Sequence, residues 1–297
     1  MKILVAGSHG MIGSAVTPYL TACGHQVSRL VRSEPRPGDV WWDPDAGEID
    51  APGLEGFDGV VHLATATWPF RWTAKAKKDI LKNRLATNRL LSESLAACAC
   101  KPRVLICASG AGYYAQSGDM VLTEDSPAGP TFLSQFDEAA EGCTGAASAA
   151  GIRVVHLRIP TVLGGRMLKF AGLQAADGHQ WVSWVGLDEV ASIIEFALRT
   201  ESLSGAVNAV SPKPLRNGDF AAIASQVLDL KLGPTMPAFV VRMTMGEFGE
   251  EFILGSRRIE PARLLAAGYQ FRFPELADAL RHEKEVVDVA PAAEAVG

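Results

Sequence analysis

A glycine-rich turn between an apolar run and a helical pattern constrains this chain more than any other feature. Lys2–Ala6 is a short apolar run typical of a strand that is buried on both faces. The turn that follows it contains three glycines, Gly7, Gly10 and Gly13. With this spacing, Gly7 permits a tight turn, Gly10 lets the backbone approach a pyrophosphate, and Gly13 lets the next helix pack close to the strand.

The residues that follow the turn favour dinucleotide binding. We expect a helix over Met11–Ala22 that ends at Gly24, and then a strand over Gln26–Val31 that closes a βαβ unit. The unpaired N–H groups at the start of the helix, which includes Met11 and Ile12, would hold the phosphates. The alternative is that the glycines only tighten a strand-to-helix turn.

The end of the second predicted strand indicates which dinucleotide is bound. An acidic side chain there would accept hydrogen bonds from the adenosine ribose of NAD, but this chain has Arg29 and Arg32. One charge-assisted hydrogen bond from a guanidinium to a phosphate is worth about 1.5–3 kcal/mol, which is a tenfold or greater preference. We therefore predict NADP rather than NAD. The alternative for Arg32 is a solvated surface arginine.

The composition excludes several classes of protein. The chain has 297 residues, of which 48% are hydrophobic and 21% charged, so it can bury a full core. Its net charge of −5, without a long basic run, argues against nucleic acid or a membrane surface as partner. The five cysteines lack metal-ligand spacing, and we expect buried free thiols and no metal. Met1 leads straight into the first strand, and no apolar run is long enough to span a bilayer. We therefore expect a cytoplasmic protein without a signal peptide.

Strand and helix patterns alternate along most of the chain. Strands are expected at residues 2–6, 26–31, 40–42, 59–64, 103–108 and 153–159, and further helices at 73–99 and 132–150. This alternation predicts an α/β fold with a Rossmann-type doubly wound parallel sheet.

The character of the sequence changes after residue 211. Helices are expected at residues 217–228, 237–254 and 261–267, then an alternating segment at 269–273 and a last helix that opens at Pro274. We predict an NAD(P)-binding domain over residues 1–211, a small mainly helical C-terminal domain over 212–286 and a flexible tail over 287–297. The small domain would pack over the substrate side of the sheet.

Ligands of such sheets bind beyond the carboxyl ends of the strands. This rule assembles one site from four loops, at residues 7–13, 64–67, 109–114 and 160–164. The aromatic residues Trp68, Phe70 and Trp72 would either wall this site or pack beneath a loop. His62, inside a strand, is interpreted as a core residue, and His179 as a surface residue. Glu124 and Asp125 would bind a substrate hydroxyl or cap a turn.

Several motifs resemble the extended short-chain dehydrogenases/reductases, and within them the nucleoside-diphosphate-sugar epimerase-like branch with an extra C-terminal domain. The motifs are GSHGMIG, RWT at residues 71–73, NRLATN at 83–88, SGAGYYA at 109–115, LTEDSPAG at 122–129, QWVSW at 180–184 and GSRRIEPARLLAAGYQFRFPEL at 255–276. They cover almost the whole chain, so the resemblance is specific for fold. For activity it implies an epimerase or reductase without naming a reaction.

The resemblance also implies roles for individual residues. It places the NADP adenosine near Arg32, and its adenine and ribose near Leu63 and Ala64. Further cofactor contacts would come from Asp79 and Arg84.

Ser109 matches the catalytic-site serine of the family. The nicotinamide would lie between Ser109 and the turn that contains Pro160 and Val162.

The sequence departs from the family at the positions that usually carry the proton chemistry. Typical members have a tyrosine as general acid/base and a lysine four residues later, and these places fall here on Leu133 and Asp137. Leucine transfers no proton, and an aspartate would raise the pKa of a neighbouring tyrosine. The segment 163–180 is also shorter than in the branch. A histidine is replaced by Gly186, which predicts a wider or more open pocket.

Two hypotheses remain open. In the first, the protein is an NADP-dependent oxidoreductase or epimerase acting on a small carbonyl or sugar-like substrate, with Ser109 holding the substrate oxygen and Tyr113, or its neighbour Tyr114, carrying the proton. In the second, it keeps the dinucleotide fold for a non-redox isomerisation or cyclisation, or as a cofactor-binding regulator. The missing tyrosine–lysine pair favours the second, and the glycine turn with Arg32 favours the first. A homodimer is an open alternative to a monomer.

Overall fold

The computed structural model describes residues 1–65, 69, 71–231 and 235–289. Its centre is an eight-stranded sheet of order β12-β8-β6-β5-β1-β2-β3-β4, in which all neighbours are parallel except β3 and β4. The strands are β1 (Lys2–Ala6), β2 (Gln26–Val31), β3 (Val40–Asp43), β4 (Glu48–Ile49), β5 (Gly59–His62), β6 (Val104–Gly110), β8 (Arg153–Ile159) and β12 (Gly205–Asn208). The predicted doubly wound α/β sheet is confirmed.

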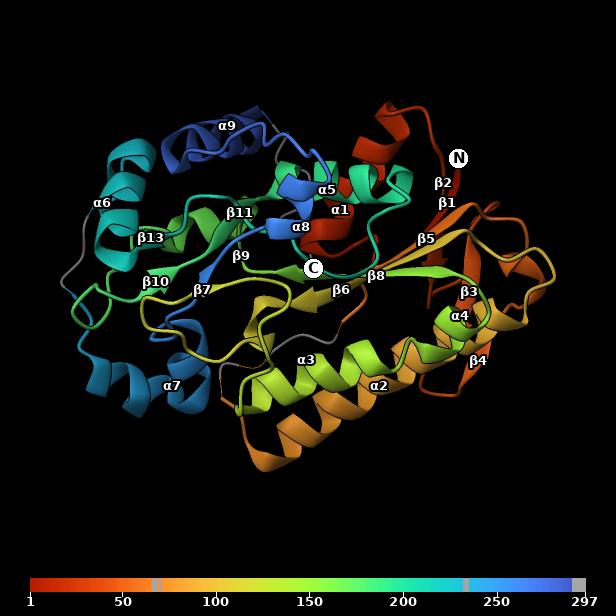
Figure 1. The fold of residues 1–297 in the computed structure, drawn as a ribbon, viewed down its shortest axis with the longest axis horizontal. Coiled ribbons are helices and arrows are strands. Elements are labelled where there is room, and N and C mark those ends of the chain that lie inside the picture. Colours follow the sequence, from red (N-terminus) through yellow and green to blue (C-terminus); the bar gives the residue numbers. More distant parts are fainter. Residues whose placement is uncertain (66–68, 70, 232–234, 290–297) are drawn as a thin grey trace.

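Helices cover both faces of the sheet (Figure 1). On one face lie α1 (Met11–Ala22) and α5 (Leu187–Arg199), and on the other lie α2 (Ala74–Ala97), α3 (Phe132–Gly142) and α4 (Gly145–Ala149). The alternating side chains of β1 serve both layers, because Ile3 and Val5 belong to one buried cluster and Leu4 and Ala6 to the other. A strand that is apolar at every position is therefore required here.

The region predicted as one helix over residues 132–150 contains two, and this prediction was wrong. Helix α3 ends at Gly142, and α4 begins at Gly145. Between them, the Thr144 hydroxyl donates to the backbone carbonyl of Glu141 at 2.9 Å and also contacts His156 Nε2 at 2.9 Å. A threonine that bonds the local backbone offers an alternative to continued helix, and its tie to β8 fixes the break.

The region after residue 211 is mainly helical, as expected. It contains α6 (Asn217–Leu228), α7 (Ala238–Phe252), α8 (Ala262–Ala266) and α9 (Leu276–Val289). A kink divides α7 at Gly246, whose φ of 57° and ψ of −137° are not helical. The segment 269–273 forms no strand. Its Tyr269 hydroxyl and the backbone N–H of Arg272 donate to Glu189 instead.

Two pairs of short strands join this region to the preceding part of the chain: β7 (Val121–Leu122) with β14 (Arg258–Ile259), and β10 (Trp181–Val182) with β13 (Leu215–Arg216). A third pair, β9 (Thr161–Leu163) with β11 (Trp184–Gly186), lies before residue 211. Three 3₁₀ helices complete the described structure: η1 (Pro52–Leu54), η2 (Ala111–Tyr113) and η3 (Gly165–Phe170). The proposed domain limits remain a prediction. Helix α9 runs to Val289, and the rest of the predicted tail lies outside the described residues.

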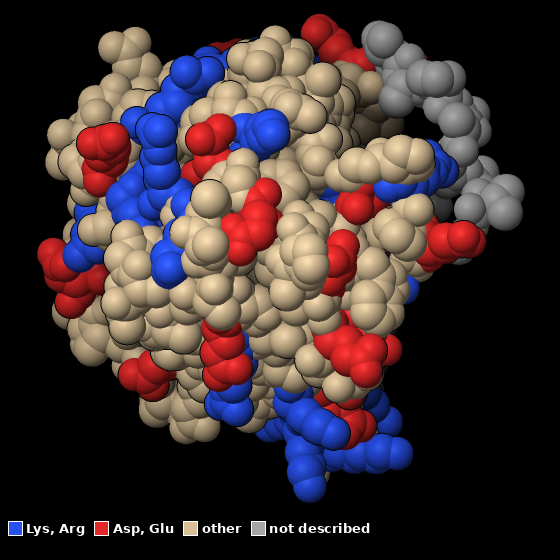
Figure 2. All heavy atoms as spheres, turned by 90° about the vertical axis from the view of Figure 1, so that its right-hand side faces the viewer, with Lys and Arg blue, Asp and Glu red and all other residues tan. Residues whose placement is uncertain are grey.

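The structure also tests what we expected of membrane helices, surface charge and the cysteines. No helix in the described ranges is long and apolar enough to cross a membrane. Figure 2 shows basic side chains interleaved with acidic ones on the face at the right of Figure 1. The prediction of buried thiols holds for Cys98 and Cys107 only. Cys23 and Cys100 are exposed, and Cys143 is half-buried.

Candidate functional site

The glycine turn lies where the strand order reverses. From β1 the chain passes to β2 on one side of the sheet and later returns to β5 on the other. In sheets of this kind the ligand crevice lies at this switch point, beyond the carboxyl ends of the two strands. Gly7 has a φ of +81°, and a Cβ there would lie 2.6 Å from the backbone nitrogen of Ala64. Two segments predicted to contact the cofactor, Gly7 and the pair Leu63 and Ala64, are thus in direct contact.

The other two glycines have different surroundings. A Cβ on Gly13 would lie 2.1 Å from the carbonyl oxygen of Gly7, so the helix packs directly on the turn. A Cβ on Gly10 would meet only that same oxygen, at 3.4 Å. Gly10 is also the N-cap of α1, and no side chain caps this end of the helix. The open space beside Gly10 and the uncapped amides of Met11 and Ile12 fit a pyrophosphate group.

The two arginines at the end of β2 are in different situations. Arg29 makes a two-bond ion pair with Asp39, at 3.1 Å and 2.7 Å. The side chain of Arg32 is 47% exposed, and its contact is a single 3.4 Å pair with Asp45, which is itself 71% exposed. Its guanidinium carbon lies 6.0 Å from the centre of the Trp42 ring. Arg32 is therefore available to a ligand phosphate, and Arg29 is engaged.

Two residues of α2 were implied as cofactor contacts. Arg84 is buried, and its guanidinium donates to the carbonyl oxygen of Ala64 at 2.8 Å and to that of Ala108. It therefore joins the ends of β5 and β6, the two strands from which the site is built. Asp79 is exposed on the same helix. For both residues a contact with the cofactor stays a prediction.

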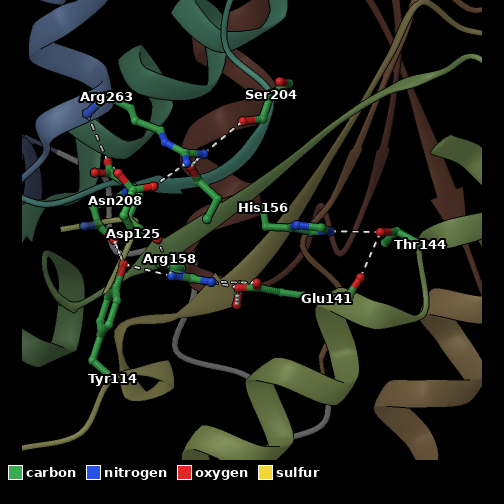
Figure 3. A network of polar contacts seen from close by, with 12 residues as sticks. Tyr114, Asp125, Glu141, Thr144, His156, Arg158, Ser204, Asn208 and Arg263 are labelled. Carbon is green, nitrogen blue, oxygen red and sulfur yellow. Dashed lines mark hydrogen bonds and ion pairs between the residues drawn. The ribbon is translucent and has the colours of Figure 1, made fainter. Parts of the chain in front are cut away.

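Ser109, at the end of β6, contacts a polar network that contains Glu141 and Arg158. Figure 3 shows how Glu141, Arg158 and Tyr114 lie in this network. The Ser109 hydroxyl donates to Glu141 Oε1 at 2.7 Å. Arg158 donates to both oxygens of the same carboxylate at 2.9 Å, and through its remaining nitrogen to the Tyr114 hydroxyl at 2.9 Å. The Tyr114 hydroxyl donates to Asn208 Oδ1 at 2.6 Å.

The sequence reasoning missed Glu141 and Arg158 as site residues. One signal was present, because Arg158 is a charged residue inside the apolar strand β8 and is only 3% exposed. An arginine that is so deeply buried requires a partner. The position of that partner, 17 residues earlier on α3, could not be read from the strand.

Leu133 and Asp137 lie against the turn that follows Ser109, on one face of α3. A Cβ on Gly112 would overlap the Leu133 side chain, and a Cβ on Gly110 would lie 2.5 Å from Asp137 Oδ2. Asp137 is 4% exposed, and burial raises its pKa to about 7 against the opposing charge of Arg84. The two places that hold tyrosine and lysine in the wider family are therefore filled here by a hydrocarbon and a carboxyl group.

The two tyrosines in the turn differ in burial. Tyr114 is fully buried, and burial raises its pKa to about 12, which favours a structural role. Tyr113 is half-buried at the end of η2, and the Arg158 guanidinium lies 3.4 Å from the centre of its ring. Of the two, Tyr113 is the better placed to meet a ligand, and its catalytic role stays a prediction.

The remaining candidates are mostly structural. His62 is fully buried, contacts Asn88 Oδ1 at 2.9 Å, and has a pKa lowered to about 3 by burial, as expected of a core histidine. Buried Glu124 accepts hydrogen bonds from the backbone of Asn208 and Arg263. His179 is exposed.

The aromatic loop is described only in part. Trp72 packs edge-on against Phe132, Phe248 and Phe252, with ring centres 5.4–5.9 Å apart. Trp68, Phe70 and residues 66–67 lie outside the described residues. Pro160 is half-buried, and Val162 is buried in β9, at the edge of the predicted nicotinamide site.

The space at Gly186 is not open, contrary to expectation. A Cβ on Gly186 would lie 3.0 Å from Oε1 of Glu283, and one on Gly164 would lie 3.2 Å from Oε2 of the same residue. This carboxyl group reaches in from α9 and accepts a hydrogen bond from the Asp188 backbone at 3.1 Å. A side chain from the C-terminal region thus occupies the volume that the missing histidine was expected to vacate.

Family models agree with this geometry. The model for the NAD dependent epimerase/dehydratase family matches residues 3–209, and a domain of unknown function, DUF1731, matches residues 236–283. The chain belongs to the NAD-dependent epimerase/dehydratase family. The resemblance found in the sequence motifs is thereby confirmed.

Relatives within the family cover nearly the whole chain. Epimerase family protein ML0860 of Mycobacterium leprae is 33% identical over 292 residues, 94% of each chain. The crystal structure of human epimerase family protein SDR39U1 with NADPH covers 98% of this chain and 100% of that one, at 30% identity and a TM-score of 0.83. A nucleoside-diphosphate sugar epimerase from Corynebacterium glutamicum is 32% identical with a TM-score of 0.80. It covers 95% of this chain, which spans 58% of that longer one.

Proposed function

We propose that this protein is an NADP(H)-dependent oxidoreductase or epimerase that acts on a small carbonyl or sugar-like substrate. The observation that carries the proposal is Arg32, an exposed guanidinium at the end of β2 beside an uncapped helix start. The human relative whose crystal structure was solved with NADPH supports the same cofactor. We also propose a cytoplasmic protein, with a homodimer as the alternative to a monomer.

Different residues of the crevice would bind different parts of the cofactor and the substrate. The amides of Met11 and Ile12 would bind the pyrophosphate, and Arg32 the phosphate on the adenosine ribose. Leu63 and Ala64 would contact the adenosine, while Pro160 and Val162 would flank the nicotinamide opposite Ser109. The bound cofactor supplies a hydride donor or acceptor. Ser109 would hold the substrate oxygen, and Tyr113 would carry the proton.

Cofactor titrations test this assignment. NADPH and NADH are titrated against wild type, Arg32→Ala and, as a matched control, Arg29→Ala. Wild type should prefer NADPH about tenfold or more, because one charge-assisted hydrogen bond is at stake. Arg32→Ala should lose that preference, whereas Arg29→Ala should keep it, since Arg29 is engaged by Asp39. Equal affinities of the wild type for the two cofactors would refute the proposal.

A specific observation favours a second function. Because Leu133 and Asp137 fill the usual tyrosine and lysine places, the same fold could bind the cofactor without redox turnover, for a non-redox isomerisation or cyclisation or as a regulator. The absorbance of NADPH at about 340 nm, followed with a panel of carbonyl compounds, separates the two. Turnover that is lost in Tyr113→Phe supports the oxidoreductase. Tight NADPH binding without oxidation by any compound supports the second function.

A further inference from the structure

The hydrogen bond made by Ser109 has a defined direction. A serine hydroxyl has one hydrogen and two acceptor lone pairs, whereas an ionised carboxylate can only accept. Ser109 Oγ lies 2.7 Å from Glu141 Oε1, so the single hydrogen of the hydroxyl is directed at the carboxylate. The crevice side of Ser109 then presents lone pairs and no donor.

Arg158 prevents this direction from reversing. The Ser109 hydrogen could turn elsewhere only by giving up its hydrogen bond to the carboxylate and setting a lone pair against it. Glu141 could donate to Ser109 only if it were protonated or turned away. Either change would remove the anion that accepts two hydrogen bonds from Arg158, which is 3% exposed, and would leave a buried cation without its partner.

Arg158 itself cannot follow such a movement. Its third nitrogen donates to the buried Tyr114 hydroxyl (Figure 3). Its guanidinium carbon also lies 3.4 Å from the centre of the Tyr113 ring. Charges in the protein therefore favour one orientation of the Ser109 hydroxyl before any ligand binds.

We propose that Ser109 acts as a hydrogen-bond acceptor, so that the site recognises a ligand through a hydroxyl group, such as that of a secondary alcohol or a sugar, rather than through a carbonyl oxygen. A ligand hydroxyl can donate its hydrogen to a lone pair of Ser109. A carbonyl oxygen is also an acceptor, so it would meet these lone pairs without forming a hydrogen bond. Glu141 and Arg158 are positioning residues in this account. The inference rests on the proposed function, because it uses the same crevice.

A neutron structure of deuterium-exchanged crystals tests the direction itself. We expect a deuteron on Ser109 Oγ that points at Glu141, and none on the Glu141 carboxylate. A deuteron on Glu141, or one on Ser109 that points into the crevice, would overturn the proposal. This result does not depend on any cofactor or substrate, so it stands apart from the proposed function.

Matched ligand pairs test the recognition. Isopropanol with acetone, and cyclohexanol with cyclohexanone, differ only in one hydroxyl or carbonyl group, and neither ketone has a hydroxyl group. Their binding is measured by ligand-observed NMR with the protein saturated with tetrahydro-NADP, which transfers no hydride. We expect the alcohol of each pair to bind about five- to tenfold more tightly, the value of one net hydrogen bond. Equal binding, tighter ketone binding or no alcohol binding would contradict the proposal.

Two variants separate positioning from general damage. Ser109→Ala should abolish the preference, because it removes the acceptor. The double variant Glu141→Leu, Arg158→Met replaces the ion pair with apolar groups and frees the Ser109 hydrogen, so the preference should also disappear. A single cooperative transition in urea, followed by tryptophan fluorescence, shows that each variant is folded. If the wild type does not bind tetrahydro-NADP, the proposed function fails, while the neutron result still decides the direction of the Ser109 bond.

Discussion

Asp137→Asn should change the pH dependence of stability. The Asp137 carboxyl is 4% exposed, accepts a hydrogen bond from the Gly110 backbone, and has an Oδ2 atom without a partner among the described residues. Burial raises its pKa from an ordinary 3.8 to about 7. Between these two values the folded protein holds a proton that the unfolded chain has released, so the free energy of unfolding falls as pH rises.

The size of the effect follows from the two pKa values. At about 1.4 kcal/mol per pH unit, the carboxyl costs the folded state about 1.6 kcal/mol near pH 5 and about 4 kcal/mol near pH 8. Asparagine carries no charge and keeps an oxygen for the Gly110 N–H, so it avoids this cost. Relative to wild type, Asp137→Asn should therefore gain about 2–3 kcal/mol of stability between pH 5 and pH 8.

Urea unfolding followed by tryptophan fluorescence at constant ionic strength measures this difference. The control is Glu138→Gln, because Glu138 is the next residue of the same helix and is exposed. The change in stability difference between pH 5 and pH 8 should be larger for Asp137→Asn than for this control. The reasoning is refuted if the free energies of unfolding of wild type and Asp137→Asn change in parallel with pH. It is also refuted if Asp137→Asn loses stability relative to wild type as pH rises, which would mean that Arg84 keeps the buried carboxylate ionised.

Three other predictions concern the glycine turn and α9. Gly13→Ala should cost about 1–3 kcal/mol of unfolding free energy in urea titrations, because its Cβ would lie 2.1 Å from the Gly7 oxygen. Gly10→Ala should unfold like wild type yet bind NADPH more weakly in calorimetry, since its Cβ has room in the protein but not beside a pyrophosphate. Equal NADPH affinity of Gly10→Ala and wild type would contradict that role. For Glu283→Gln, we expect a gain of about 2 kcal/mol over wild type as pH rises from 5 to 8, because burial raises the pKa of Glu283 to about 7. Parallel pH curves in the same urea assay would show this to be wrong.

The parts of the fold that were predictable depend on local patterns. The limits of α1 and β2 follow from one glycine turn, one helical period and Gly24, whose φ is +82°. Helix α6 was likewise predicted at its observed limits. The break between α3 and α4 was not predictable, because it depends on a contact between Thr144 and His156 on β8. Periodicity contains no information about such a partner.

The same limit applies to the candidate site. Sequence patterns predicted the glycine turn and Arg32, because each lies at a strand end, and the family resemblance predicted Ser109. They could not show that Glu283 fills the space at Gly186, a contact between residues 97 positions apart. Nor could they show which carboxylate receives the Ser109 hydrogen, since Glu141 reaches the site only through the packing of α3 on β6. Long-range polar contacts depend on how the elements pack, and local sequence patterns do not predict that packing.

The missing tyrosine–lysine pair is accompanied by a different arrangement of charges around Ser109. Leu133 and Asp137 fill the two places. In the wider family, the helix that follows the serine strand supplies the cation. Here that helix supplies two carboxyl groups, Asp137 and Glu141, while the cations come from Arg84 on α2 and Arg158 on β8. A lysine at position 137 would stand as a third cation beside these two arginines, with Glu141 as the neighbouring carboxylate to balance them. The charges around Ser109 therefore suit a site whose proton chemistry and hydrogen-bond polarity differ from those of the tyrosine–lysine enzymes.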